Sequence, residues 1–132
     1  MNFELGDEHQ LLKDLTARFV REQMIPLERA VLEREACGQG AALSADETAA
    51  IDRKARELGL WGLDAPEEYG GANLPEQAMI GVHEEMGKTI TPYIFPPDSP
   101  NLRMLMATAD PQQRSRYLEP YARGETTSAI AI

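Results

Sequence analysis

Apolar residues recur every three or four positions along most of this chain, and Pro or Gly interrupts each run. Leu12, Leu15 and Phe19 form the first run, with charged residues between them. Apolar residues at this spacing line one face of an α-helix. Pro and Gly between the runs end one helix and precede the next. The pattern therefore favours a set of amphipathic helices, and we predict an all-α fold.

Capping residues locate several of the helix ends. Either Ser44 or Asp46 can cap a third helix, with Glu47 available near its first turn. Asp110 before Pro111 combines a cap with a residue favoured in the first turn. Together with the apolar spacing, these signals predict about six helices. They lie at approximately residues 7–24, 27–34, 44–58, 75–87, 99–106 and 111–121.

Three segments depart from regular helix. Pro26 lacks a backbone donor and predicts a bend that separates the first two helices. Residues 60–63 form an apolar run between a Gly stop and a Pro-Gly turn, so we expect Trp61 in that run to be substantially buried. Residues 127–132 alternate in the manner of a short strand. The predicted fold class is one all-α, bundle-like domain over residues 1–132, with a short carboxy-terminal strand.

The charge balance disfavours several classes of partner. The chain has 13 basic and 22 acidic residues, which gives a formal net charge of −9. Such a surface repels nucleic-acid phosphates and anionic lipids, so we expect neither nucleic acid nor membrane as a partner. No apolar stretch approaches membrane-spanning length, and the acidic amino terminus does not look like a secretory signal. Cys37 is the single cysteine, which fits a reducing, cytoplasmic compartment.

Four motifs follow one another in an order that resembles a known family. Residues 58–74, LGLWGLDAPEEYGGANL, join an apolar Gly-Leu run to Pro-Glu-Glu-Tyr-Gly-Gly. The segment FELGDEHQLLKDLTARFVRE at residues 3–22 precedes it, and VHEEMGK at 82–88 and ADPQQRSRYLEPYARGE at 109–125 follow it. In this order they resemble the acyl-CoA dehydrogenase family, and the resemblance covers nearly the whole chain.

The resemblance implies that the chain is the amino-terminal helical domain of a flavoenzyme. In that family a middle β domain holds FAD, and a carboxy-terminal helical domain supplies a catalytic glutamate. The glutamate removes the α-proton of an acyl-CoA thioester while a hydride leaves the β-carbon for the flavin. The implied partners are therefore the acyl-CoA substrate, and a homo-oligomer or a complete dehydrogenase subunit. Because the family's glutamate and most of its FAD site would lie beyond Ile132, the chain alone is expected to be inactive and not to retain FAD.

The same resemblance implies positions for five site residues. Ile130 and Ile132 would lie near the flavin ring, and Phe95, Leu102 and Met106 would lie toward the acyl cavity. Apolar residues at helical spacing more often form ordinary core, so core packing stays open as the alternative role for Leu102 and Met106. No residue of the chain is expected to be catalytic.

Two other groups of residues are interpreted structurally. His83, Glu84 and Glu85 lack a second histidine at helical spacing, so a solvated helix face is favoured over a metal site. Gly70 and Gly71 follow no predicted strand, so they are interpreted as a tight chain reversal and not as a phosphate-binding loop.

Two other functional classes stay open. The chain could be a non-catalytic helical interaction module, including a truncated subunit that pairs with a complete dehydrogenase. It could also be a small-ligand carrier, which would require a closed apolar cavity within these residues.

Overall fold

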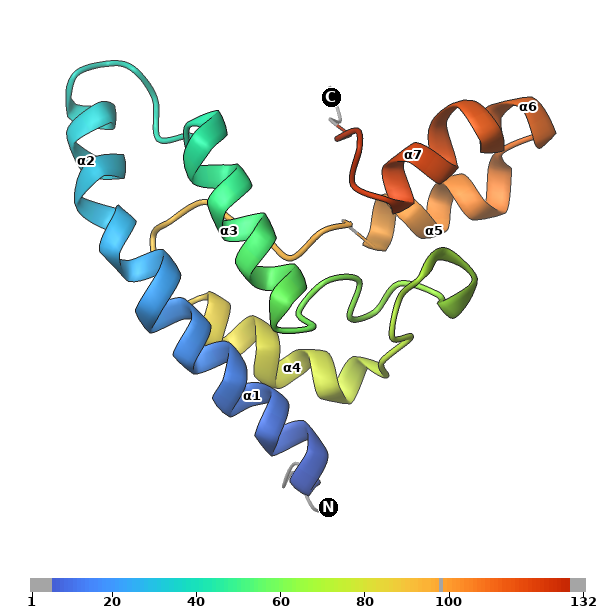
Figure 1. The fold of residues 1–132 in the computed structure, drawn as a ribbon, viewed down its shortest axis with the longest axis horizontal. Coiled ribbons are helices and arrows are strands. Elements are labelled where there is room, and N and C mark those ends of the chain that lie inside the picture. The colour runs from blue at the N-terminus through green and yellow to red at the C-terminus, as the bar shows by residue number, and fades with distance from the viewer. Residues whose placement is uncertain (1–5, 98, 129–132) are drawn as a thin grey trace. The chain divides into compact units, whose positions relative to one another are not determined.

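The computed structural model describes residues 6–97 and 99–128, and these residues are helical with connecting loops (Figure 1). Within them, five α-helices are nine residues or longer. These helices are α1 (Asp7–Phe19), α2 (Glu28–Ala36), α3 (Ala45–Glu57), α4 (Glu76–Met86) and α5 (Ser99–Thr108). A further helical segment consists of α6 (Pro111–Gln113), a π-helical turn (Arg114–Leu118) and α7 (Glu119–Ala122).

The all-α class is confirmed for the described part of the chain, where no residue is in a β-strand. Of the predicted carboxy-terminal strand, Thr127 and Ser128 have no regular secondary structure. Residues 129–132 lie outside the described residues, so the remainder of that strand stays a prediction.

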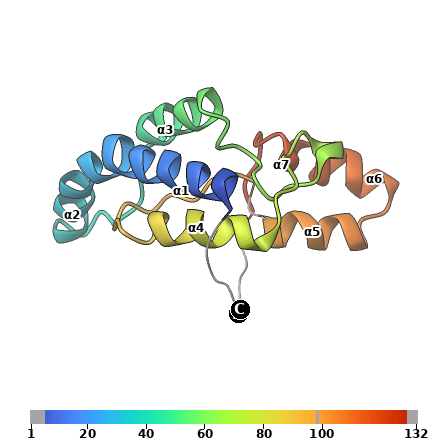
Figure 2. The same cartoon turned by 90° about the horizontal axis from the view of Figure 1, so that it is seen from below.

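The helices belong to two compact units. The first unit, Met1–Leu60 with Pro75–Ile94, contains α1 to α4, and the second, Trp61–Leu74 with Phe95–Ile132, contains α5 to α7. In the first unit α1 lies along α4 in both views (Figures 1 and 2). The fully or almost fully buried apolar side chains of this unit are Phe19, Val20, Met24, Val31, Ile51, Ala55, Leu60, Ala78, Met79 and Val82.

The path from α1 to α2 remains helical through Pro26. A proline in an α-helix removes one hydrogen bond, and its ring clashes with the carbonyl one turn earlier. Here the chain passes through a π-helical turn, Val20–Met24, and a 3-10 turn, Ile25–Leu27, before α2 begins. The second π-helical turn, Arg114–Leu118, begins at the same distance before Pro120. Two distinct helices, α1 and α2, therefore flank Pro26 as predicted, but changes of helix type keep the path between them helical.

A carboxylate joins the end of α2 to the start of α3. Ser44 is the cap of α3: its Oγ accepts a bond of 3.2 Å from the Glu47 amide, and its own amide donates to Glu47 Oε2 at 2.8 Å. Arg34 of α2 donates from Nη1 to Glu47 Oε1 at 3.1 Å, and its Nη2 lies 3.0 Å from Oε2. The bond from the Ser44 backbone, followed by that from Arg34, lowers the pKa of Glu47 below its usual value of 4.5.

The lowered pKa of Glu47 predicts an acid-sensitive contribution to stability. A carboxyl group whose pKa is lower in the folded chain stabilises that chain above the unfolded pKa, and this contribution is lost as the pH falls through the folded pKa. In urea unfolding between about pH 3 and pH 7, Glu47→Gln should therefore lose less stability on acidification than the wild type. Glu35→Gln, which removes an exposed carboxylate of α2, is the control and should follow the wild type. Parallel profiles for Glu47→Gln and the wild type would contradict the assignment.

Candidate functional site

The loop Trp61–Leu74 of the second unit folds back on itself and supports the residues that follow Ile94. Backbone hydrogen bonds of 2.8 to 2.9 Å close the loop. They run from Leu74 to Leu63, from Asn73 to Ala65, and from Ala72 to Gly62. The loop is therefore an ordered platform that does not depend on regular secondary structure.

The glycine pair in this loop is required by the backbone. Gly70 ends the 3-10 turn Glu67–Tyr69 with a φ of 79°, in the left-handed region that favours glycine. A Cβ atom on Gly71 would overlap the carbonyl group of Ala65 and would lie 2.7 Å from the Ala65 side chain. The pair is a tight chain reversal, as predicted, and the Ala65 carbonyl occupies the space beside Gly71.

Two hydrogen bonds join this platform to Phe95 and α5. The Gly62 amide donates to the Pro96 carbonyl at 2.9 Å, and Arg103 Nη2 donates to the Asp64 carbonyl at 3.2 Å. The peptide bond between Pro96 and Pro97 is cis. The partly buried Phe95 directly precedes this segment, so the platform sets the position of its backbone.

Leu102 and Met106 differ in how deeply they are buried in the second unit. Leu102 is fully buried. The other buried members of its cluster are Ala65, Leu118, Tyr121 and Ala122, and the partly buried Tyr69, Leu105 and Met106 pack against it. Met106 therefore has side-chain surface that a ligand could touch, whereas Leu102 has none within this unit. The acyl-cavity role of these residues stays a prediction.

Polar side chains fix both ends of α5. Near its start, Asn101 Nδ2 donates to Ser128 Oγ at 2.9 Å, and that hydroxyl donates to the Tyr121 hydroxyl at 3.2 Å. At its end, Arg114 Nη2 donates to the Met106 carbonyl at 2.7 Å. These bonds hold α5 in register with the helical segment that follows. The predicted flavin-side residues, Ile130 and Ile132, lie outside the described residues.

The aromatic side chains of the second unit differ in their burial. Trp61 is only partly buried, so the expectation of a substantially buried indole is met in part. Large indole rings are seldom covered completely. Tyr117 is half exposed and stacks against the guanidinium of Arg116, 5.3 Å from its ring centre.

A buried carboxylate lies in the first unit where a solvated helix face was predicted. Glu85 of α4 is almost completely buried, and both of its oxygens accept bonds of 2.8 Å from Lys88. Lys13 of α1 lies 3.8 Å from Glu85 and 2.7 Å from Glu84. Glu84 and His83 are exposed, as expected. The solvated-face interpretation is therefore wrong for Glu85 alone.

The burial of Glu85 was visible in its spacing. Ala78, Val82 and Glu85 share one helix face, and the first two are core residues. A lysine one turn later can neutralise a carboxylate on that face. Among residues 6–97 and 99–128, no group of three or more His, Cys, Asp or Glu side chains could hold a metal ion.

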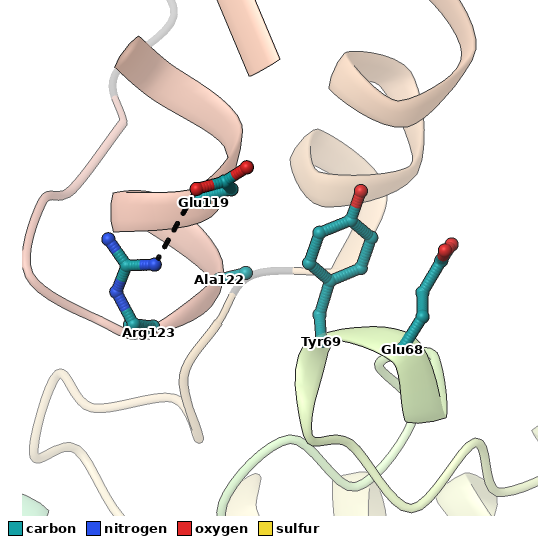
Figure 3. A pocket seen from close by; sticks show the side chains of 5 residues that line it. All are labelled: Glu68, Tyr69, Glu119, Ala122 and Arg123. Carbon is teal, nitrogen blue, oxygen red and sulfur yellow. Dashed lines mark ion pairs between the residues drawn. The ribbon is translucent and has the colours of Figure 1, made fainter. Parts of the chain in front are cut away.

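The second unit also has a surface hollow of about 330 Å³ (Figure 3). Its lining consists of Glu68 and Tyr69 from the loop platform, Glu119 and Ala122 from α7, and Arg123 directly after α7. Glu119 Oε2 and Arg123 Nη1 are 3.8 Å apart. The two walls are distant in sequence, so no local motif indicates this hollow.

Comparison with known proteins gives one family. Residues 6–125 match the family model described as "Acyl-CoA dehydrogenase, N-terminal domain". The chain is 36% identical to the (R)-benzylsuccinyl-CoA dehydrogenase of Thauera aromatica, in an alignment that covers 98% of this chain and 34% of that protein. It is 26% identical to the 3-(aryl)acrylate reductase of Clostridium sporogenes, with coverages of 96% and 32%.

A mammalian relative has the same sequence identity to the chain as the C. sporogenes protein. The chain is 26% identical to the mitochondrial short-chain specific acyl-CoA dehydrogenase of Mus musculus, and the alignment covers 98% of this chain and 30% of the relative. The chain thus spans about one third of the length of these three relatives. No solved structure matches it. No helix in the described part of the chain is long and apolar enough to cross a membrane.

Proposed function

The chain belongs to the acyl-CoA dehydrogenase family, and from that premise we propose that it serves as the amino-terminal helical domain of an enzyme that removes hydrogen from the α- and β-carbons of an acyl-CoA thioester. The observation that carries the proposal is the family match over residues 6–125. The similarity to a protein named (R)-benzylsuccinyl-CoA dehydrogenase supports a CoA thioester as the substrate class.

The contribution of this domain is an apolar wall of the acyl pocket. Met106 and Phe95 are partly exposed apolar side chains that can contact an acyl group. Leu102 is fully buried in the cluster against which Met106 packs, so its proposed role is to support this wall from within the core. Proton removal and hydride transfer belong to groups outside this chain, as they do in the family. Pairing with a complete dehydrogenase subunit would bring those groups to the wall, and a homo-oligomer is the other assembly that the family suggests.

The family is FAD-dependent, and FAD accepts the hydride when it is bound in a complete enzyme. Neither the hollow nor the glycine loop fits this cofactor. The carboxylates of Glu68 and Glu119 would repel its pyrophosphate from the hollow, and the Ala65 carbonyl occupies the space beside Gly71. Ile130 and Ile132 remain proposed flavin-side residues.

The 132-residue chain, purified alone, is expected to be colourless and not to oxidise acyl-CoA. The reason is that, in the family, the glutamate that accepts the proton and most of the site for the flavin that accepts the hydride lie in the other domains. The measurement is the visible flavin absorption after incubation with FAD and desalting, together with an acyl-CoA assay that uses an artificial electron acceptor. Retained FAD or turnover would contradict this part of the proposal.

A chimera provides the positive test. Residues 6–125 would replace the corresponding third of the T. aromatica relative, and the product would be assayed with (R)-benzylsuccinyl-CoA. We expect a yellow protein with measurable turnover, because the domain is proposed to supply a generic apolar wall. A folded, flavin-containing chimera without turnover would favour the alternative, a non-catalytic interaction module that pairs with a complete dehydrogenase.

A further inference from the structure

The hollow of the second unit has two polar walls and a small floor (Figure 3). Glu119 and Arg123 stand on one wall, one helical turn apart, and Glu68 and Tyr69 stand on the other. Ala122 lies between the walls, and its short side chain leaves the space open. The volume of about 330 Å³ is at the lower end of the range for ligand pockets.

The single cation of the hollow is already balanced by a neighbouring anion. Arg123 donates from Nε and Nη2 to the two oxygens of Glu125, at 2.8 and 3.3 Å, whereas its contact with Glu119 is 3.8 Å. The hydrogen bond from Arg123 lowers the pKa of Glu125 below its usual value of 4.5. The carboxylates of Glu119 and Glu68 therefore leave the hollow with a net negative charge.

We propose that this hollow binds the guanidinium group of an arginine side chain presented by a partner polypeptide. A guanidinium carries several donors in a planar fork, which suits a hollow that has the carboxylate of Glu119 on one wall and that of Glu68, beyond Tyr69, on the other. Its flat face also stacks on aromatic rings such as that of Tyr69. Glu119 and Arg123 are about half exposed, so a side chain can enter from solvent.

The charges separate this occupant from the obvious competitors. The phosphates of a CoA ester or a nucleotide would be repelled by Glu68 and Glu119. A lysine ammonium is a point charge without the planar fork, so it matches the two walls less well.

The test is an NMR titration of the ¹⁵N-labelled 132-residue chain with N-acetyl-arginine N-methylamide. We expect saturable shifts at the amides of residues 68–69 and 119–123, with a Kd on the order of ten millimolar or weaker, because exposed ion pairs and a single cation–π contact are each weak. The uncharged citrulline analogue should give no saturable shifts. Equal binding of the citrulline analogue, or saturable binding of CoA at the same amides, would overturn the proposal.

Three variants with the same charge change localise the effect. Glu68→Gln and Glu119→Gln should each weaken binding by about threefold to fivefold. Glu67→Gln removes a neighbouring exposed carboxylate that does not line the hollow, and it should leave the Kd within about twofold of the wild type. Equal weakening by all three would mean that the ligand senses only the general acidity of the surface, which would also overturn the proposal. Unfolding midpoints of the variants verify that each remains folded.

Discussion

Gly71→Ala is expected to lower the free energy of unfolding by about 3 kcal/mol or more, a large loss for the addition of one methyl group. The new Cβ would overlap the Ala65 carbonyl, which is backbone and cannot move aside by a rotamer change. That carbonyl also accepts the Asn73 amide at 2.9 Å, so relief of the overlap disturbs the hydrogen bonds that close the loop. The measurement is a urea-unfolding midpoint followed by the fluorescence of Trp61, the single tryptophan.

Gly38→Ala is the matched control. Gly38 also has a positive φ, of 73°, but an added Cβ there meets nothing within 4 Å. This variant tests the strain of the left-handed conformation without the overlap, and it should cost only about 1 to 2 kcal/mol. Similar losses in the two variants would show that the close approach of Gly71 to Ala65 is absent in solution.

Leu102→Ala is expected to cost about 2 to 5 kcal/mol, because it opens a cavity in the core of the second unit. Leu102 is fully buried among Leu118, Tyr121 and the other members of its cluster. Met106→Ala removes a side chain that is only partly buried, so its cost should be clearly smaller. Urea unfolding followed by Trp61 fluorescence measures both losses.

The two variants also distinguish a residue that supports the proposed acyl wall from one that contacts the substrate. In the active chimera, Met106→Ala should raise the KM for the acyl substrate with little effect on the unfolding midpoint. Leu102→Ala should mainly lower the midpoint. Comparable stability losses, with no change in KM for Met106→Ala, would show that Met106 is ordinary core and would remove it from the proposed acyl wall.

The features that the sequence predicted well depend on neighbours in the chain. The capping bonds of Ser44 with Glu47, and of Asp110 with Gln113, join residues three positions apart, so the local sequence contains both partners. The spacing of Glu85 from Ala78 and Val82 indicates its burial, but its ion pair with Lys13 could not be predicted because Lys13 belongs to a different helix. Pattern alone identifies an apolar face, but it does not pair charges between helices.

From the sequence, the candidate site could be predicted only as a row of apolar residues at helical spacing. Leu102 and Met106 lie at helical spacing, but they differ in burial. Leu102 belongs to the buried cluster with Leu118 and Tyr121, whereas the partly buried Met106 only packs against that cluster. The close approach of Gly71 to Ala65 depends on how the whole loop closes. That closure involves several distant backbone bonds, for which no short motif is diagnostic.

The π-helical turns before Pro26 and Pro120 have a consequence for how this chain should be aligned with its relatives. A π turn encloses one more residue than an α turn, so each behaves locally as a one-residue insertion. A relative without the proline could dispense with that residue and retain an uninterrupted α-helix. Gaps in an alignment should therefore fall within residues 20–24 or 114–118, and a gap placed elsewhere would rotate the downstream side chains onto the wrong face of the helix.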